Sequence, residues 1–229
     1  MFVFTTLIAV NQKPWFLAEH LARLRRQSEE LGFIYPGDEV VIPDLIRNLD
    51  QQRFSISKIR LSVGENTHKT EIFTFSPPEA HCYRGVKVII SSQRVHPTQA
   101  HLKTSNRLPY ELAKQEADEQ GAFEALLLDN HGHVVDGTRT SPLLYQKNTL
   151  TLLEGGLDGI TRLQVADAAK KMGIAVESRY VFPSELTGQL LLAGSGVGLL
   201  PVDFVVDEKI EELINHFQLP ALDYNQVKK

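Results

Sequence analysis

The sequence predicts an α+β fold in two domains, with a strand-rich C-terminal domain. The runs IRLSV at 59–63 and EIFTF at 71–75 alternate with the period of two that half-buried antiparallel strands show. Between such runs lie stretches of helical spacing, the clearest at 15–31, where leucines recur every three to seven residues. We expect an N-terminal α+β domain at 1–95 and a strand-rich C-terminal domain at 96–229.

Composition excludes several classes of protein. The 229 residues are 42% hydrophobic and 23% charged, with a net charge of −4, so a globular protein is expected and nucleic-acid binding is not. The single cysteine, Cys82, rules out a disulfide within the chain and a cysteine-rich zinc site, and no metal is expected. The apolar start at 1–10 lacks a basic leader and is too short to span a bilayer. We therefore expect a cytoplasmic protein with no membrane partner.

The N-terminal elements follow from local signals. Val, Phe, Thr and Ile at 2–10 favour a strand, and Pro14 precedes the helix at 15–31. A second helix is expected at 43–53, beginning at Pro43, and a strand at 86–91.

The C-terminal elements follow a polar connector at 92–101. A helix is expected at 107–120, ending before Gly121, and FEALLLD reads as a strand. Two short strands are expected around 143–153, and a helix follows GGLDGITR. The last helix is expected at 207–217.

Two glycine-containing stretches are candidate anion sites. GITRL at 159–163 turns into a helix N-terminus, whose free N–H groups and dipole favour an anion, and Thr161 adds a hydroxyl. The alternative is that Thr161 only caps its helix. AGSGVGLLP at 193–201 contains Ser195, but its spacing is not that of a dinucleotide-binding loop. A phosphate-binding turn and a plain tight turn remain open for this stretch.

Taken singly, the charged candidates have ordinary structural interpretations. His20 and Arg23 lie one helical turn apart, and an isolated arginine there is normally solvated. Asp136 precedes Gly137 at a strand end, where an aspartate commonly caps a turn. Lys103, before a helix, would be a surface lysine.

Their order along the chain indicates a family. Six motifs follow one another along the chain: H-x-x-R-L, a lysine before N-R-L, E-A-L-L-L-D, an acid before glycine, G-I-T-R and a glycine/serine turn ending in P-V. This set resembles the class IV (fold type IV) pyridoxal-phosphate enzymes, which include D-amino-acid aminotransferases, branched-chain aminotransferases and 4-amino-4-deoxychorismate lyases. The resemblance covers almost the whole chain. It implies the two-domain fold of D-amino-acid aminotransferase, pyridoxal 5'-phosphate as cofactor and a homodimer.

The resemblance also implies residue roles. Lys103 would bind the cofactor as a Schiff base and then act as general base at the substrate carbon. Arg23 would pair with the phosphate, and Asp136, in the position of the family's glutamate, would keep the pyridine nitrogen protonated. The remaining phosphate contacts would be Ile160, Thr161 and Ser195.

Several positions depart from the family pattern. Members usually have further residues ahead of FVFTT. Asp136 is one methylene shorter than glutamate, Ser141 stands where an asparagine is common, and Ile8 where many members carry an arginine. With these departures, cofactor binding is still expected, but a degenerate, non-catalytic relative is an alternative. A yellow purified protein, which shows a bound Schiff base, would exclude that alternative.

Two reactions compete within the family. KTSNRL at 103–108 is similar to the lyase pattern, and in FTT at 4–6 the second threonine, Thr6, would assist an elimination. LAKQEADEQGAFEALLL at 112–128 is equally similar to D-amino-acid aminotransferases. Because that stretch is mainly helix and core strand, the site residues count for more. We therefore expect a lyase that cleaves 4-amino-4-deoxychorismate, a small molecule, to 4-aminobenzoate and pyruvate for folate synthesis, with a D- or branched-chain amino-acid aminotransferase as alternative.

Overall fold

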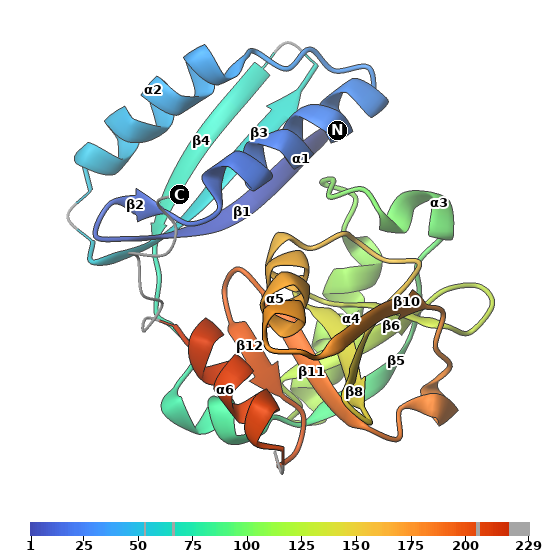
Figure 1. Ribbon diagram of the computed structural model, residues 1–229. Helices are drawn as coiled ribbons and strands as arrows, with labels where there is room; N and C mark the ends of the chain where they lie inside the picture. Colours follow the sequence, from blue (N-terminus) through green and yellow to red (C-terminus); the bar gives the residue numbers. More distant parts are fainter. Residues whose placement is uncertain (53, 66, 205–206, 220–229) are drawn as a thin grey trace. The chain divides into compact units, whose positions relative to one another are not determined.

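The computed structural model describes residues 1–52, 54–65, 67–204 and 207–219. The described residues form two compact units, Met1–Pro77 with Leu102–Asn106, and Pro78–His101 with Arg107–Leu219 (Figure 1). This division differs from the expected boundary at 95/96, because β5 (Val88–Arg94) pairs in parallel with β6 (Glu124–Leu128) of the second unit. The expected α+β class is confirmed.

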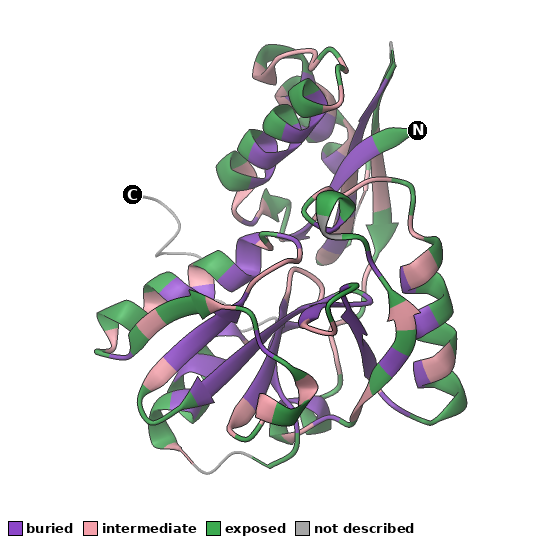
Figure 2. Cartoon of the chain, turned by 90° about the vertical axis from the view of Figure 1, so that its right-hand side faces the viewer, coloured by how far each residue is buried: buried purple, intermediate pink, exposed green. Residues whose placement is uncertain are grey.

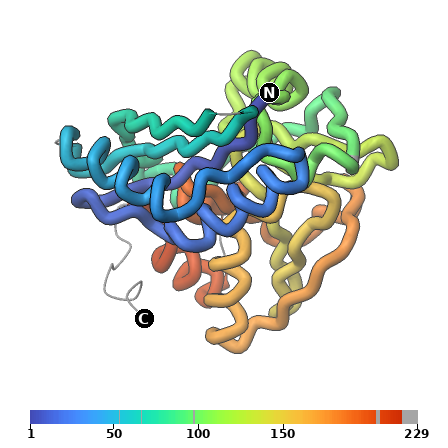
Figure 3. The backbone as a smooth tube through the Cα atoms, turned by 90° about the horizontal axis from the view of Figure 1, so that it is seen from above, coloured from blue at the N-terminus to red at the C-terminus, as the bar shows by residue number. Residues whose placement is uncertain are grey.

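The first unit is a four-stranded antiparallel sheet covered on one face by two helices. Its elements are β1 (Phe2–Val10), β2 (Lys13–Pro14), α1 (Leu17–Glu30), α2 (Asp38–Asp50), β3 (Ile56–Gly64) and β4 (Thr67–Thr74), and the strand order is β2-β1-β3-β4. Val3 and Leu7 of β1 point into the core with Leu24 of α1 and Leu45 of α2. Figure 3 shows both helices running beside the strands of this sheet.

The start of α2 corrects a sequence expectation. The helix begins at Asp38 rather than at Pro43, which lies inside it. Asp38 and Glu39 occupy the first turn, where carboxylates interact favourably with the helix N-terminus. Leu45 and Leu49 lie four residues apart and are buried on one face, so core packing continues the helix through the proline.

The second unit contains two sheets. Its elements are η1 (Ala80–Arg84), β5, α3 (Pro97–Ala100), α4 (Leu108–Glu119), β6, β7 (Val134–Gly137), β8 (Ser141–Gln146), β9 (Thr149–Leu153), α5 (Ile160–Lys171), β10 (Ala175–Arg179), η2 (Pro183–Glu185), β11 (Gln189–Gly194), β12 (Gly198–Pro201) and α6 (Glu208–Phe217). The strand orders are β5-β6-β7 and β10-β9-β8-β11-β12. Alanines of α4 pack on the three-stranded sheet, and the helices carry one buried and one exposed face (Figure 2).

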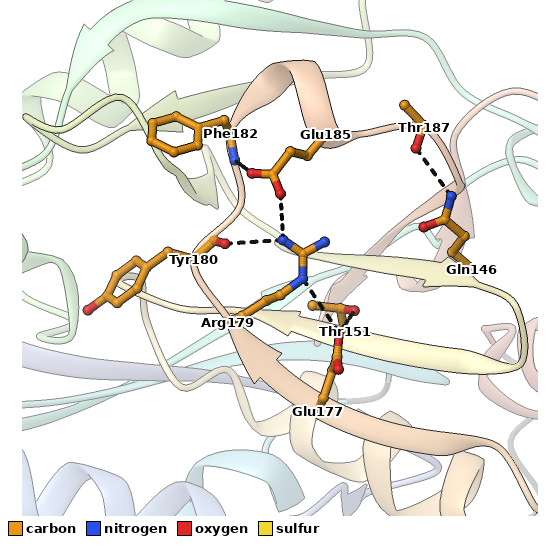
Figure 4. Close-up of polar contacts among 8 residues, drawn as sticks. All are labelled: Gln146, Thr151, Glu177, Arg179, Tyr180, Phe182, Glu185 and Thr187. Carbon is orange, nitrogen blue, oxygen red and sulfur yellow. Dashed lines mark hydrogen bonds and ion pairs between the residues drawn. The ribbon is translucent and has the colours of Figure 1, made fainter.

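The connection from β10 to β11 is fixed by one arginine. Arg179 Nη1 lies 2.8 Å from Oε1 of Glu185, and Arg179 Nε lies 3.5 Å from Oε1 of Glu177 (Figure 4). The second oxygen of Glu185 accepts from the N–H of Phe182 at 2.8 Å. These contacts close the turn of η2, after which the chain enters β11.

No helix within the described residues combines the length and the apolar character that a bilayer crossing requires.

Glu116 fastens α4 to the end of β5. Its carboxylate accepts hydrogen bonds from the Ser91 hydroxyl at 2.7 Å, the Ser92 N–H at 2.9 Å and the Gln93 amide at 3.0 Å. The side-chain bonds from Gln93, Ser92 and Ser91 lower the pKa of Glu116 to about 2.

We predict that Glu116→Gln lowers the stability of the protein at pH 7, by about 1 kcal/mol or a Tm loss of about 2–4 °C, because the amide keeps only one acceptor oxygen where both carboxylate oxygens accept hydrogen bonds. A carboxyl whose pKa is lower in the folded state than in the unfolded state stabilises the fold at pH values above the unfolded-state pKa. The difference in stability between wild type and Glu116→Gln should therefore shrink as pH falls from about 4.5 toward 2. Thermal melts across this range check it, with the exposed Glu119→Gln as control. A difference between wild type and Glu116→Gln that does not change with pH would contradict the role given to the charge.

Candidate active site

Lys103 lies on a short segment that returns to the first unit beside β1. The N–H of Phe4 donates to the Lys103 carbonyl at 2.8 Å, and the N–H of Ser105 donates to the Phe2 carbonyl at 2.9 Å. The Lys103 N–H in turn donates to the side-chain oxygen of Gln27 on α1 at 3.1 Å. The backbone of Lys103 is therefore held on both sides, although it belongs to no regular element.

The amine of Lys103 shares a face of the sheet with Thr6. Its Nζ lies 5.1 Å from the ring centroid of Phe4. Phe4 and Thr6 are two residues apart on β1, so their side chains point to the same face. Arg60 of β3 is the direct partner of Thr6, and its guanidinium lies 4.9 Å from the same Phe4 ring. The structure thus brings two cations to one aromatic ring, on the face of β1 to which Thr6 also points.

Arg23 lies on the other side of β1 and is buried, not solvated. Its side chain is on α1, 4% exposed, and its Nη2 lies 2.8 Å from the hydroxyl of Thr5. The same hydroxyl lies 2.6 Å from Nδ1 of His20. Burial lowers the pKa of His20 well below its ordinary value, and the charges of Arg23 and Lys103 lower it further. A neutral imidazole therefore lies beside a buried guanidinium.

In the second unit, Asp136 lies at the end of β7 and is 6% exposed. The turn that follows it is held by Glu124 of β6, which is fully buried. The Glu124 carboxylate accepts from the N–H groups of Thr138 and Arg139 and from the hydroxyl of Thr140. The chain direction after Asp136 is thus fixed by a second carboxylate, not by Asp136 alone.

The other candidates of this unit gather around the start of β8. A side chain at Gly156 would place its Cβ 1.9 Å from the Val135 carbonyl oxygen, and one at Gly159 would place it 2.7 Å from the Ser141 hydroxyl. Ser141 pairs with Ala193 of β11, so the β11–β12 turn that contains Ser195 begins beside it. The loop before α5, Ser141 and this turn therefore meet at one end of the five-stranded sheet.

Ile160 and Thr161 form the first turn of α5. Both are buried, and their N-cap residue, Gly159, makes no side-chain capping bond. The N–H groups of this turn keep their capacity for an anion. Arg162 of the same motif is not counted among the anion-binding residues, because its Nη1 donates to the Leu153 carbonyl at 2.8 Å.

The donor set fits pyridoxal 5'-phosphate. The cofactor needs an amine, a cradle for its phosphate and a carboxylate for its ring nitrogen. Lys103 supplies an amine with a fixed backbone, and Asp136 a nearly buried carboxylate. The glycines at 156 and 159 allow backbone approaches that no other residue permits beside the uncapped helix end.

Sequence reasoning left three contributors without a role. Thr5, Gln27 and Glu124 hold Arg23, Lys103 and the turn after Asp136, respectively. His20 was visible in the H-x-x-R motif, but its hydrogen bond to Thr5 joins residues 15 positions apart. A buried acid such as Glu124, inside an otherwise apolar strand, is the signal that a sequence offers for such a network.

Comparisons with known proteins identify the family of this chain. The family model described as "Amino-transferase class IV" matches residues 2–204. A solved structure described as "Putative 4-amino-4-deoxychorismate lyase" is 50% identical, with a TM-score of 0.92 over 96% of this chain and 90% of that one.

Two curated relatives carry aminotransferase names. The "Probable branched-chain-amino-acid aminotransferase" of Thermotoga maritima is 29% identical over 87% of this chain and 76% of its own length. The "D-alanine aminotransferase" of Bacillus licheniformis is 24% identical over 91% and 80%. The family match spans most of the chain. The chain therefore belongs to the class IV aminotransferase family and is a pyridoxal 5'-phosphate-dependent enzyme.

Proposed function

We propose that this enzyme is a lyase that cleaves 4-amino-4-deoxychorismate to 4-aminobenzoate and pyruvate, a step of folate synthesis. The proposal is based on one observation: the Lys103 amine lies beside Phe4, on the face of β1 to which Thr6 also points. A lyase needs a base for a carbon-bound proton and a hydroxyl near the leaving group. The 50% identity to the structure described as a lyase also favours this reaction over transamination.

Cofactor binding would draw on six residues. Lys103 would bind it covalently, Arg23 would pair with its phosphate, and Asp136 would interact with its ring nitrogen. The remaining contacts to the phosphate are Ile160, Thr161 and Ser195. When bound, pyridoxal 5'-phosphate withdraws electrons from the carbon that carries the substrate nitrogen.

The residues of this chain would then move two protons. Lys103 Nζ takes the proton from the amine-bearing carbon of the substrate, the C–O bond to the enolpyruvyl group breaks, and the ring becomes aromatic. The Thr6 hydroxyl would hydrogen-bond the leaving group, which becomes pyruvate after gaining a proton. Aromatisation supplies driving force, so the shorter carboxylate of Asp136 costs an elimination less than it costs a transamination.

Arg60 would bind a carboxylate of the substrate. On β4 its cross-strand neighbour is Glu71, but Glu71 pairs with Lys69 at 2.6 Å. The guanidinium of Arg60 instead contacts the ring of Phe4, next to Lys103. A planar guanidinium suits a carboxylate, and the substrate carries two.

Two alternatives are tested together with the lyase. The names of the curated relatives favour an aminotransferase of D- or branched-chain amino acids, and the altered positions 136 and 141 favour a non-catalytic relative. The purified protein, also examined by size for the proposed homodimer, is assayed for 4-aminobenzoate from aminodeoxychorismate and for pyruvate from D-alanine. Transamination without 4-aminobenzoate would replace the lyase proposal, and a colourless protein that gains no absorbance with cofactor would favour the third reading.

We predict that borohydride reduction of the cofactor-loaded protein places the pyridoxyl label on Lys103, because a reduced Schiff base is a stable amine. Peptide mapping by mass spectrometry reads out the position. Lys87→Gln, which removes an exposed lysine of the second unit, should keep the label. A label on another lysine of the cofactor-saturated protein would remove Lys103 from its role.

We predict that Asp136→Asn keeps cofactor binding but lowers turnover at least about tenfold, because it removes the charge that holds the ring nitrogen protonated. Asp136→Glu restores the family's residue and should hold or raise activity. A turn-capping aspartate predicts the opposite order, because asparagine caps well and glutamate poorly. Cofactor titration, turnover and thermal melts of both variants separate the two roles.

We predict that Arg60→Gln raises KM for the anionic substrate about tenfold, with a smaller change in kcat, because it removes a charge-assisted hydrogen bond. Arg47→Gln removes the same charge from an exposed position on α2 and is the control. Equal kinetics for both variants would mean that Arg60 only packs on Phe4.

A further inference from the structure

The Thr5 hydroxyl is a fully buried group with two polar neighbours. Thr5 is 0% exposed on β1, and its Oγ1 lies between His20 Nδ1 and Arg23 Nη2 at 2.6 and 2.8 Å. His20 and Arg23 are three residues apart on α1, so they present to the same side of the helix. One hydroxyl therefore links two side chains of the motif H-x-x-R.

The direction of each hydrogen bond follows from the chemistry of the groups. A guanidinium has only donors, so the Thr5 oxygen accepts from Arg23. The hydroxyl has one proton, and His20 Nδ1 is its one acceptor among the described residues. A buried hydroxyl proton without an acceptor is costly, so Nδ1 carries no proton and the ring is neutral, with its proton on Nε2.

The surroundings of His20 agree with a neutral ring. The imidazole is 1% exposed and has Arg23 on its own helix and Lys103 on the returning segment as nearby charges. Both charges are positive, so a proton on Nδ1 would be repelled as well as desolvated.

We propose that Thr5 and His20 are positioning residues that orient Arg23 for the phosphate of the cofactor. This inference rests on the proposed role of Arg23. Neutral His20 accepts the hydroxyl proton, which turns the oxygen lone pairs of Thr5 toward Arg23. The Arg23 guanidinium is then held before the ligand arrives, so less side-chain freedom is lost on binding.

The test compares two ligands that differ only in the phosphate. Affinities of the apoenzyme for pyridoxal 5'-phosphate and for pyridoxal are measured by absorbance titration. Thr5→Val keeps the shape of the side chain but removes the hydroxyl, and should weaken pyridoxal 5'-phosphate about tenfold while leaving pyridoxal unchanged. Thr5→Ser restores the hydroxyl and should recover most of the affinity for the phosphate form. A Thr5→Val protein that binds both ligands as wild type does would overturn the inference.

Arg23→Ala separates this inference from the proposed function. It should weaken only the phosphate-bearing ligand, by at least as much as Thr5→Val. If Arg23→Ala affects neither ligand or both equally, the phosphate role of Arg23 is wrong and the inference falls with it. If Arg23→Ala is selective and Thr5→Val is not, only the positioning role is wrong.

A further readout needs no cofactor. Nitrogen-15 NMR of the histidine rings of wild-type apoenzyme at neutral pH should show His20 as the neutral tautomer with its proton on Nε2, assigned with His20→Gln. A proton on Nδ1, or a doubly protonated ring, would contradict the hydrogen-bond directions and overturn the inference even if the affinities change.

Discussion

The return of residues 102–106 to the edge of β1 is the constraint on which the candidate site depends. These five residues are far in sequence from the first unit, yet their backbone hydrogen bonds to Phe2 and Phe4 include them in it. Without these bonds, Lys103 would be a flexible residue of a connector. With them, its amine lies beside the same aromatic ring as Arg60. A reactive lysine needs this restriction, because a base is effective only from a defined position.

β1 is consequently used on both faces. Thr5 points to α1 and contacts the H-x-x-R motif, whereas Phe4 and Thr6 point to the face shared with Lys103. The strict alternation of a strand is what separates the two roles in three consecutive residues. A shift of the β1 register by one residue would exchange the two sets, and the nine residue pairs with β3 oppose such a shift.

Elements with a strong local signal could be predicted from the sequence. The strand runs at 59–63 and 71–75 and the helix at 107–120 before Gly121 were predicted without tertiary information and correspond to β3, β4 and α4. The predicted start of α2 at Pro43 was wrong, because packing of the helix leucines in the core outweighs the tendency of proline to stand at the start of a helix. The Glu124 network could not be predicted, because it joins residues 14 to 16 positions apart across a turn. The roles given to the site residues came from the order of motifs, and the described contacts supply reasons why Lys103, Arg23 and Asp136 are held.

The choice between lyase and aminotransferase depends on separating residues that pack the core from residues of the candidate site. The stretch 112–128, which is similar to D-amino-acid aminotransferases, consists largely of α4 and β6. Its buried residues, Ala113, Ala117 and Leu127 among them, belong to one core cluster. Such positions are constrained by packing, which enzymes of one fold share whatever their reaction. Thr6 and Lys103, by contrast, take no part in that cluster, and the Lys103 amine lies beside the ring of Phe4 on the face of β1 to which Thr6 points. Residues outside the packed core therefore say more about the reaction, whereas the similarity of the core bears only on the fold.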